Sequence, residues 1–365
     1  MAPPPPPPRR RRSSPALMDE LVEEILLRVP PDEPAHLVRA ALVCKAWHRI
    51  VSDHGFLRRY RKVHRPPPLL GYIGNLYYGS ITRFVPTSAA SPFSPPALAA
   101  RGWWALDCRH GRVLIETVPT GLVVWDPITG DQQHLSIPVY QYSCSAAAVL
   151  CATDNCDHLD CHSGPFRVVF VASSINYMES VTLATVYSSE TGAWSPSTSI
   201  DTDYYVEATP SLLIRDALYF TLQLGVRILK YDLGRHELSE IDTPGVRGAI
   251  IVKAEDRGLG FACVLDNIIY LLSRQAGAIG IAGPGWAELW VIKFETLFPK
   301  CNTSSSCNLI GFAEDKDIVF IRRDSGVFTL ELKSGKVRKI GERGAYKAIL
   351  PYMSVYTPGM LQWAD

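Results

Sequence analysis

Two different spacings of hydrophobic residues divide the chain. From residue 17 to about residue 64, apolar residues recur three or four positions apart, which is typical of amphipathic helices. After residue 68 the pattern changes to short apolar runs and to alternation of apolar and polar residues, which is typical of strands. The sequence therefore predicts a small helical segment followed by a much longer all-β region.

The helical segment is predicted to hold three or four short helices. The first has an apolar face whose members recur at helical spacing: Leu21, Val22, Ile25, Leu26 and Val29. Pro30-Pro31 ends this helix, and a second helix begins near Pro34. The residues of the second helix that we expect to point inward are Leu37, Val38, Leu42 and Val43. A last helix is capped by Ser52-Asp53 and carries four apolar residues, Phe56, Leu57, Tyr60 and Val63.

The longer region contains many short strands with no convincing helix between them. Its apolar runs lie at 113–115, 122–125, 168–172, 182–187, 212–214, 218–221, 228–231, 268–272, 289–294, 318–322 and 327–332. Many short strands with turn residues between them indicate a closed or repeated antiparallel architecture. A β-sandwich is the alternative.

A weak repeat favours a kelch-like β-propeller over the sandwich. Strand ends followed by tight turns recur at four glycines, Gly130, Gly192, Gly234 and Gly335. Two strands precede each turn, so the repeating unit has three or four strands, as in a propeller blade. We expect one further copy of the turn, without the sequence pattern of the others, around Val291 to Leu297. Closing such a ring requires a segment at 69–73 or 80–85 to pair with one at 349–356.

Composition and charge narrow the choice of partners. The chain is 47% apolar and 20% charged, which excludes a wholly disordered protein, and its 37 basic and 36 acidic residues nearly cancel. The basic run at 58–65 could contact nucleic acid, but Leu57, Tyr60 and Val63 recur at helical spacing between the charges. We therefore expect a solvated helix face there and no nucleic-acid partner.

The N-terminal residues and the cysteine count indicate the location of the protein in the cell. Residues 1–15 contain a proline block and the run Arg9–Arg12, which predicts a disordered tail that serves as a nuclear signal or a solubilising segment. No run approaches 18 apolar residues, so we expect no membrane partner. Nine cysteines, an odd number in a long chain, favour free thiols in a reducing compartment. The expected location is the cytoplasm, the nucleus or both.

The helical segment resembles an F-box. That motif has an opening Leu-Pro, an Ile-Leu pair on the first helix and a Val-Cys-Lys-x-Trp run. Here Leu17-Met18 stands at the opening, Ile25-Leu26 supplies the pair, and Val43 to Trp47 supplies the run. The β-region is similar, more loosely, to the propeller-like domains that follow F-boxes in large plant families, at the junctions 65–72 and 157–166. The resemblance gives a tail at 1–15, an F-box at 16–65 and a substrate-recognition domain at 69–365.

The resemblance also implies a function and a binding site. F-boxes dock onto the Skp-type adaptor of an SCF-type cullin-RING ubiquitin ligase, and the rest of the chain binds a protein substrate, whose identity the sequence does not reveal. The implied adaptor contacts are Leu17, Ile25, Leu26, Leu37, Val38, Val43, Cys44 and Trp47. We expect about half of them to touch the adaptor and the others to lie in the internal core.

Signatures of an enzyme are absent from the sequence. There is no Gly-x-Ser-x-Gly elbow, no phosphate-binding loop and no His-Glu-x-x-His motif. We therefore expect a non-enzymatic protein without catalytic residues or cofactors. Two alternatives remain, a propeller-housed enzyme regulated through its F-box and a protein-binding scaffold that does not ubiquitinate.

One local cluster could bind a metal. Five candidate zinc ligands lie within 12 residues: Cys151, Cys156, His158, Cys161 and His162. Their spacing lacks the Cys-x2-Cys pairs of common structural zinc sites, and the aspartates between them fit an exposed loop between blades. The expectation is therefore a loop with no metal.

Overall fold

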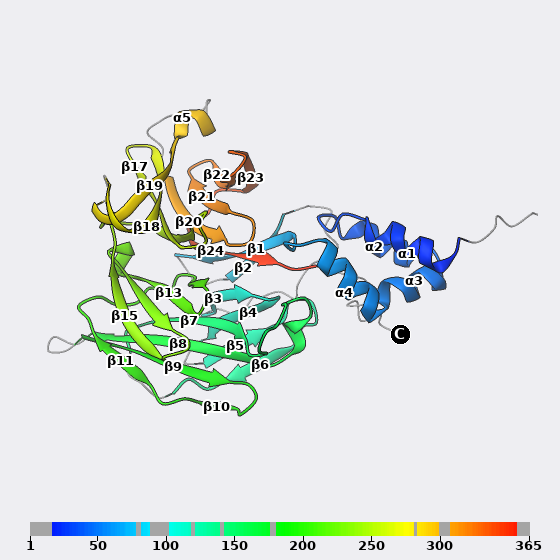
Figure 1. Cartoon of the computed structure of the whole chain (residues 1–365), viewed down its shortest axis with the longest axis horizontal. Coiled ribbons are helices and arrows are strands. Elements are labelled where there is room, and N and C mark those ends of the chain that lie inside the picture. Colours follow the sequence, from blue (N-terminus) through cyan, green and yellow to red (C-terminus); the bar gives the residue numbers. More distant parts are fainter. Residues whose placement is uncertain are drawn as a thin grey trace, which may run out of the picture.

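The computed structural model describes residues 17–77, 82–87, 102–117, 121–138, 142–175, 180–280, 283–298 and 307–355. A ring of sheets and a smaller group of helices at its side make up the described chain (Figure 1). The predicted tail at 1–15, including Arg9–Arg12, lies outside the described residues.

Four helices form the N-terminal bundle, as the sequence predicts: α1 (Asp19–Leu27), α2 (Ala35–Ala41), α3 (Lys45–Ser52) and α4 (His54–Val63). The predicted cap of the last helix is present, because Asp53 Oδ1 accepts a hydrogen bond from the Phe56 N–H at 2.9 Å. The Tyr60 hydroxyl ties α4 to the end of α1 by donating to the Val29 carbonyl at 2.7 Å. Within the described residues, no helix has both the length and the apolar character needed to cross a membrane.

The apolar faces of α1 and α2 are narrower than predicted. Val22 and Leu26 lie in the bundle core, but Leu21 and Ile25, predicted on the same face, are exposed. Leu42 and Val43 follow the last residue of α2 and are also exposed, although they were expected inside. The reason is that adjacent helical residues are turned by about 100° from one another, so a small bundle can cover only a narrow stripe of α1.

Six sheets form the ring, which confirms the propeller and excludes the sandwich. The first comprises β24 (Tyr346–Met353), β1 (Leu69–Leu76) and β2 (Thr82–Pro86), in that order. The second comprises β3 (Trp104–Arg109), β4 (Arg112–Thr117), β5 (Gly121–Trp125) and β6 (Gln132–Leu135). The third comprises β7 (Cys144–Cys151), β8 (Phe166–Ile175) and β9 (Ser180–Ser188), with β10 (Ala193–Trp194) and β11 (Thr198–Asp201) both paired to β9.

The other three blades each have four strands in chain order. The fourth comprises β12 (Leu212–Ile214), β13 (Ala217–Leu222), β14 (Arg227–Asp232) and β15 (Glu237–Asp242). The fifth comprises β16 (Ile250–Lys253), β17 (Leu259–Leu265), β18 (Ile268–Gly280) and β19 (Gly283–Lys293). The sixth comprises β20 (Cys307–Ala313), β21 (Ile318–Arg323), β22 (Gly326–Glu331) and β23 (Val337–Gly341). A short helix, α5 (Phe294–Leu297), follows β19.

The ring closes where the sequence predicts, by pairing of the first and last strands of the β-region. β1 and β24 are antiparallel, with Ile73 opposite Leu350 and Leu69 opposite Met353. The C-terminal strand thus becomes the innermost strand of a blade whose other strands come from the start of the region. Closure leaves neither end of the ring as an open sheet edge.

Apolar clusters fill the spaces between neighbouring blades. The strand β4 shows how one strand serves two of them, because Val113 and Ile115 pack toward the first blade and Leu114 packs toward the third. In the same way, Val168 and Phe170 of β8 face one neighbouring blade, and Val169 and Val171 face the other. Alternate residues of a middle strand therefore enter different cores, which explains its continuous apolar run.

The repeated turn joins the third and fourth strands of a blade. Gly130, Gly192 and Gly335 each donate an N–H to the carbonyl four residues earlier at 2.8 Å, with a positive φ that glycine adopts without strain. In the fourth blade His236, not the predicted Gly234, holds this place, with φ 56° and a 2.9 Å bond to the Asp232 carbonyl. The further copy of the turn that we expected around Val291 to Leu297 is not there, because these residues form the end of β19 and the helix α5.

A buried ion network crosses the centre of the ring. Arg109 donates to Asp107 at 2.5 Å and to Glu314 at 2.8 Å, and it also donates to the Ser211 hydroxyl at 3.1 Å. Burial raises the pKa of both carboxyl groups, although Arg109 opposes this rise. Burial also acts to lower the pKa of Arg109, but the two carboxylates outweigh it and raise that pKa. The network joins the second, fourth and sixth blades at the channel.

Closure of the ring is expected to control stability of the whole β-region. Deleting residues 346 onward should abolish its cooperative thermal unfolding, measured by circular dichroism, because β24 supplies residues to two interblade cores. In the full chain, Ile349→Ala should lower the free energy of unfolding by about 2–5 kcal/mol. The exposed Arg338→Ala should change it by less than about 0.5 kcal/mol. An unshifted, cooperative melt of the deletion variant would contradict the closed ring.

Removing only the arginine from the buried ion network should lower the stability of the protein strongly. Arg109→Met is expected to lower the free energy of unfolding in urea by about 3–5 kcal/mol, because it leaves Asp107 and Glu314 as buried carboxylates without a cation. The matched control is Arg227→Met, whose guanidinium pairs with Asp242 at 2.7 Å near the surface. This control should cost less than about 1 kcal/mol. Equal effects of the two substitutions would contradict the stabilising role of the network.

Candidate functional site

The eight implied adaptor contacts divide into three groups by exposure. The exposed group is Leu17, Ile25, Val43 and Cys44, and the half-buried group is Val38 and Trp47. Leu26 and Leu37 are only 2% and 1% exposed, and both belong to the internal core of the bundle. In this conformation the buried pair offers no surface to a partner.

Exposed apolar side chains concentrate on the helical bundle. Of the eleven large ones found among the described residues, seven lie between Leu17 and Val63. Six of these surround α1 and the connection from α2 to α3, and we name them the exposed F-box set: Leu17, Met18, Leu21, Ile25, Leu42 and Val43. Reasoning from sequence missed Met18, Leu21 and Leu42. Periodicity had placed the two leucines in the core, and no other signal in one sequence would have identified them.

Helix α4 of the bundle is docked against a loop of the third blade. This loop, residues 152–165, connects β7 to β8. Arg58 binds Asp157 and lies 3.3 Å from Asp160, and Arg61 binds Asp160. The basic run was expected to be a solvated helix face, but Arg61 is only 8% exposed. Burial lowers the pKa of Arg61, and Asp160 supplies the counter-charge for this buried guanidinium.

Apolar contacts also join the helical and β-domains. Val355, just beyond β24, lies in the core of the helical bundle beside residues such as Phe56. In return, Val38 of α2 packs against the interblade cluster that contains Leu70 and Leu350. The stiff run Pro66-Pro67-Pro68 at the junction predicts that few contacts cross it, and these contacts show that this prediction is wrong. The two domains share a mixed polar and apolar interface.

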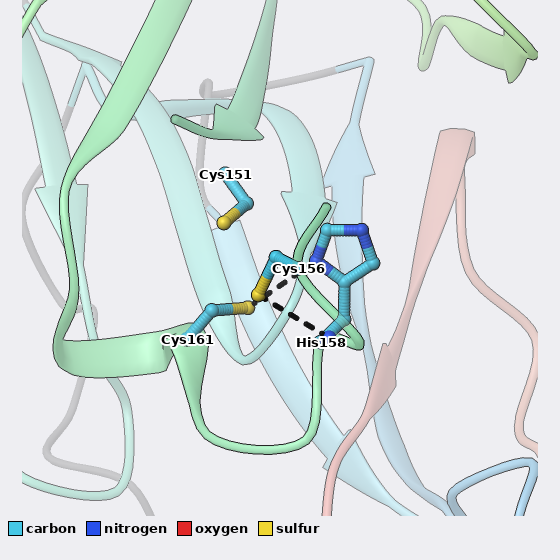
Figure 2. A group of neighbouring side chains, drawn as sticks. All are labelled: Cys151, Cys156, His158 and Cys161. Carbon is cyan, nitrogen blue, oxygen red and sulfur yellow. Dashed lines mark hydrogen bonds between the residues drawn. The ribbon is translucent and has the colours of Figure 1, made fainter. Parts of the chain in front are cut away.

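The third-blade loop at 152–165, together with the end of β7, brings four of the five candidate metal ligands together. The ligand atoms of Cys151, Cys156, His158 and Cys161 all lie within 4.8 Å of one another, and Figure 2 shows the thiols and the imidazole pointing toward one space. His162 is not part of the group. Contrary to the expected exposed loop between blades, the loop lies within one blade and Cys161 is buried.

The surroundings of this cluster favour neutral imidazoles. His110 stacks on His158 with ring centres 4.0 Å apart. Burial, followed by the charge that His158 could carry, lowers the pKa of His110 to about 3. Burial, followed by the charges that Cys151 and Cys156 could carry, raises the pKa of Cys161 to about 12.

A cavity of about 1000 Å³ lies at the other end of the central channel. The first residues of the innermost strands line it, including Trp104 of β3 and Lys347 of β24. The ends of the same strands lie on the F-box side, where Arg61 and Arg65 line a second hollow with His110. Lys347 Nζ stands 5.4 Å from the centre of the Trp104 ring. The mouth away from the F-box therefore combines aromatic and charged groups in a concave surface.

Comparisons with known proteins agree with this architecture. Residues 104–360 match the family described as "F-box protein AT5G49610-like, beta-propeller", and residues 17–59 match the F-box domain. A putative F-box protein of Arabidopsis thaliana, At1g47390, is 32% identical over 108 residues. This segment covers 30% of the present chain and 27% of that relative, so the chain spans about a quarter of the relative's length.

Solved structures resemble the chain only distantly. The WD40 domain of SCAP from fission yeast has a TM-score of 0.39 at 14% identity, covering 66% of this chain and 55% of that one. A chain of the nidogen/laminin complex has a TM-score of 0.46 at 10% identity, covering 78% of this chain and 99% of that one. Such low scores support no conclusion about function.

The assignment therefore depends on the two family matches and on the fold. The propeller match spans more than half of the chain, and the F-box match covers α1 to α3 and the first part of α4. Both agree with the resemblance identified from the sequence. The chain belongs to the AT5G49610-like family of F-box proteins with a β-propeller.

Proposed function

We propose that this F-box protein is the substrate receptor of an SCF-type cullin-RING ubiquitin ligase. The observation that carries the proposal is the exposed F-box set, six large apolar side chains gathered on a small bundle. Leaving such groups in water costs free energy, and a partner surface that covers them recovers it. F-box domains typically bind Skp-type adaptors, and the exposed F-box set is the surface that we assign to this contact.

The arrangement of the two domains suits a receptor. Helix α4 faces the propeller, whereas α1 and α3 lie at the outer side of the bundle (Figure 1). The cavity lined by Trp104 and Lys347 opens at the far end of the channel and is the assigned binding surface for the protein substrate. Adaptor and substrate therefore occupy different faces and can bind at the same time.

This role requires no catalytic residue in the chain. Holding a substrate close to a charged conjugating enzyme raises its effective concentration, and the transfer chemistry takes place elsewhere. The alternative of an enzyme in the propeller would need free carboxylates or histidines in the channel. Asp107 and Glu314 do converge there, but both are bound to Arg109, which supports a structural role for them.

The adaptor contact can be tested with a double substitution on the bundle surface. Ile25→Asp with Val43→Asp should weaken binding to a purified Skp-type adaptor by at least about 30-fold, because charges replace two apolar anchors. Both residues are more than half exposed, at 52% and 62%, so the bundle should still fold. Surface plasmon resonance measures the affinity, and circular dichroism checks the fold.

The matched control for this experiment is Val291→Asp, which places the same charge on a half-exposed valine of β19. It should bind the adaptor as the unmodified protein does. Substitutions of Leu26 or Leu37 would unfold the bundle and are not informative. Unchanged adaptor affinity of the folded double variant would refute the assigned surface.

The substrate face can be tested by reversing one charge at the cavity mouth. Lys347→Glu should remove proteins that copurify with the receptor, whereas Ile25→Asp with Val43→Asp should retain them and lose only the ligase components. Quantitative mass spectrometry of affinity-purified complexes makes the comparison. Lys336→Glu, in the exposed turn after β22, is the control. If Lys347→Glu and Lys336→Glu capture the same proteins as the unmodified chain, the substrate binds elsewhere.

A further inference from the structure

We propose that Cys151, Cys156, His158 and Cys161 form a structural zinc site that holds the third-blade loop against the F-box. The proposal replaces the expectation, drawn from the spacing alone, that this loop binds no metal. Three thiolates and one imidazole are a common ligand set of structural zinc, which prefers soft sulfur and nitrogen donors.

The distances fit a tetrahedral ion after small side-chain rotations. Tetrahedral zinc separates a sulfur and a nitrogen ligand by about 3.6 Å and two sulfurs by about 3.8 Å. Cys161 Sγ lies 3.5 Å from His158 Nδ1, and all four ligand atoms are within 4.8 Å of one another. The three sulfurs and the ring nitrogen face the same space in Figure 2, so the backbone already presents the ligands.

The backbone also supplies a hydrogen bond of the kind that stabilises metal-bound thiolates. The His158 N–H donates to Cys156 Sγ at 3.3 Å. This donor is two residues beyond its cysteine, and a positive φ of 51° at Asn155 and 54° at His158 bends the chain around the cluster. Donors to sulfur favour the charged thiolate and fix its direction.

A buried guanidinium balances the charge of the proposed site. Zinc with three thiolates and a neutral imidazole carries a net charge of about −1. Arg112 is only 4% exposed and lies close enough to Cys161 and Cys151 to interact with them electrostatically. Its Nη2 donates to the Gly164 carbonyl, but within the described part of the chain no acceptor faces Nη1. A negative cluster beside Arg112 gives this buried cation a counter-charge.

The position of the ligands gives the ion a role in domain docking. Asp157 and Asp160, which bind Arg58 and Arg61 of α4, are interleaved with the ligands Cys156, His158 and Cys161. Arg65 donates to the Asp157 carbonyl in the same segment. An ion that fixes the loop therefore fixes the acceptors that hold the F-box, and it lowers the entropy cost of forming the domain interface.

Metal analysis of the full-length protein tests the site. Protein purified under reducing conditions without chelator should contain about one equivalent of zinc per chain by inductively coupled plasma mass spectrometry. Cys156→Ser should lower this content to background, whereas Cys307→Ser, a half-buried cysteine of β20, should retain it. A zinc content far below one equivalent in the folded protein, or an equal content in both variants, would overturn the proposal.

Two further measurements do not depend on the folding of Cys156→Ser. Cobalt exchanged into the unmodified protein should give the thiolate charge-transfer and tetrahedral d–d absorption bands of a sulfur-rich site. His158→Cys should keep the metal, because it again supplies four ligands, whereas His158→Ala should bind it more weakly. Cobalt spectra typical of octahedral coordination would overturn the proposed zinc site. A disulfide among the three cysteines in protein purified under reducing conditions would overturn it as well.

Hydrogen exchange tests the role in docking. Removal of zinc with a chelator should increase amide exchange in α4, between His54 and Val63, and leave β21, between Ile318 and Arg323, unchanged. Loss of zinc without a change in α4 would overturn the docking role, even if the metal site itself is present.

Discussion

The pairing of β24 with β1 is the interaction on which the rest of the structure depends. It converts an open series of sheets into a ring, completes two interblade cores and removes two exposed sheet edges. The pairing also fixes the F-box, since α4 leads directly into β1 and Val355 follows β24 into the helical bundle. The bundle is thus attached at the point of closure, and its orientation relative to the ring follows from the same strand pair.

Sequence reasoning found most of the middle strands of the blades, although not β17, and it missed most of the innermost and outermost strands. Middle strands such as β8 and β21 bury both faces, so their apolar runs are continuous. The outermost strands have solvent on one side, and β15 reads Glu237 to Asp242 with little apolar signal. The innermost strands lie close together at the channel, where β7 uses three successive alanines, which carry no strand propensity. The number of blades followed only from the pairing.

The F-box and the cysteine and histidine cluster were visible in the sequence, but the exposure and convergence of their side chains were not. The motif located the F-box, yet a helical period cannot decide which of two adjacent apolar stripes, that of Leu21 and Ile25 or that of Val22 and Leu26, faces the core. The cysteine and histidine cluster was visible as composition. Its convergence depended on turns at Asn155 and His158, where non-glycine residues adopt positive φ, and spacing rules contain no information about such turns. The arginines of α4 acquired partners from a loop about a hundred residues away.

The place of Val355 in the helical core has a consequence for biosynthesis. A ribosome makes the F-box helices first, but the residue that completes their core is made after every blade of the propeller. Until β24 emerges, the nascent chain carries an unpaired β1 edge and lacks the Val355 side chain that belongs to the cluster of Phe56. Unpaired strand edges and exposed apolar groups make incomplete chains prone to aggregation. Completion of the F-box core is thereby linked to completion of translation through β24, so that a chain halted earlier has neither a closed ring nor a finished helical core.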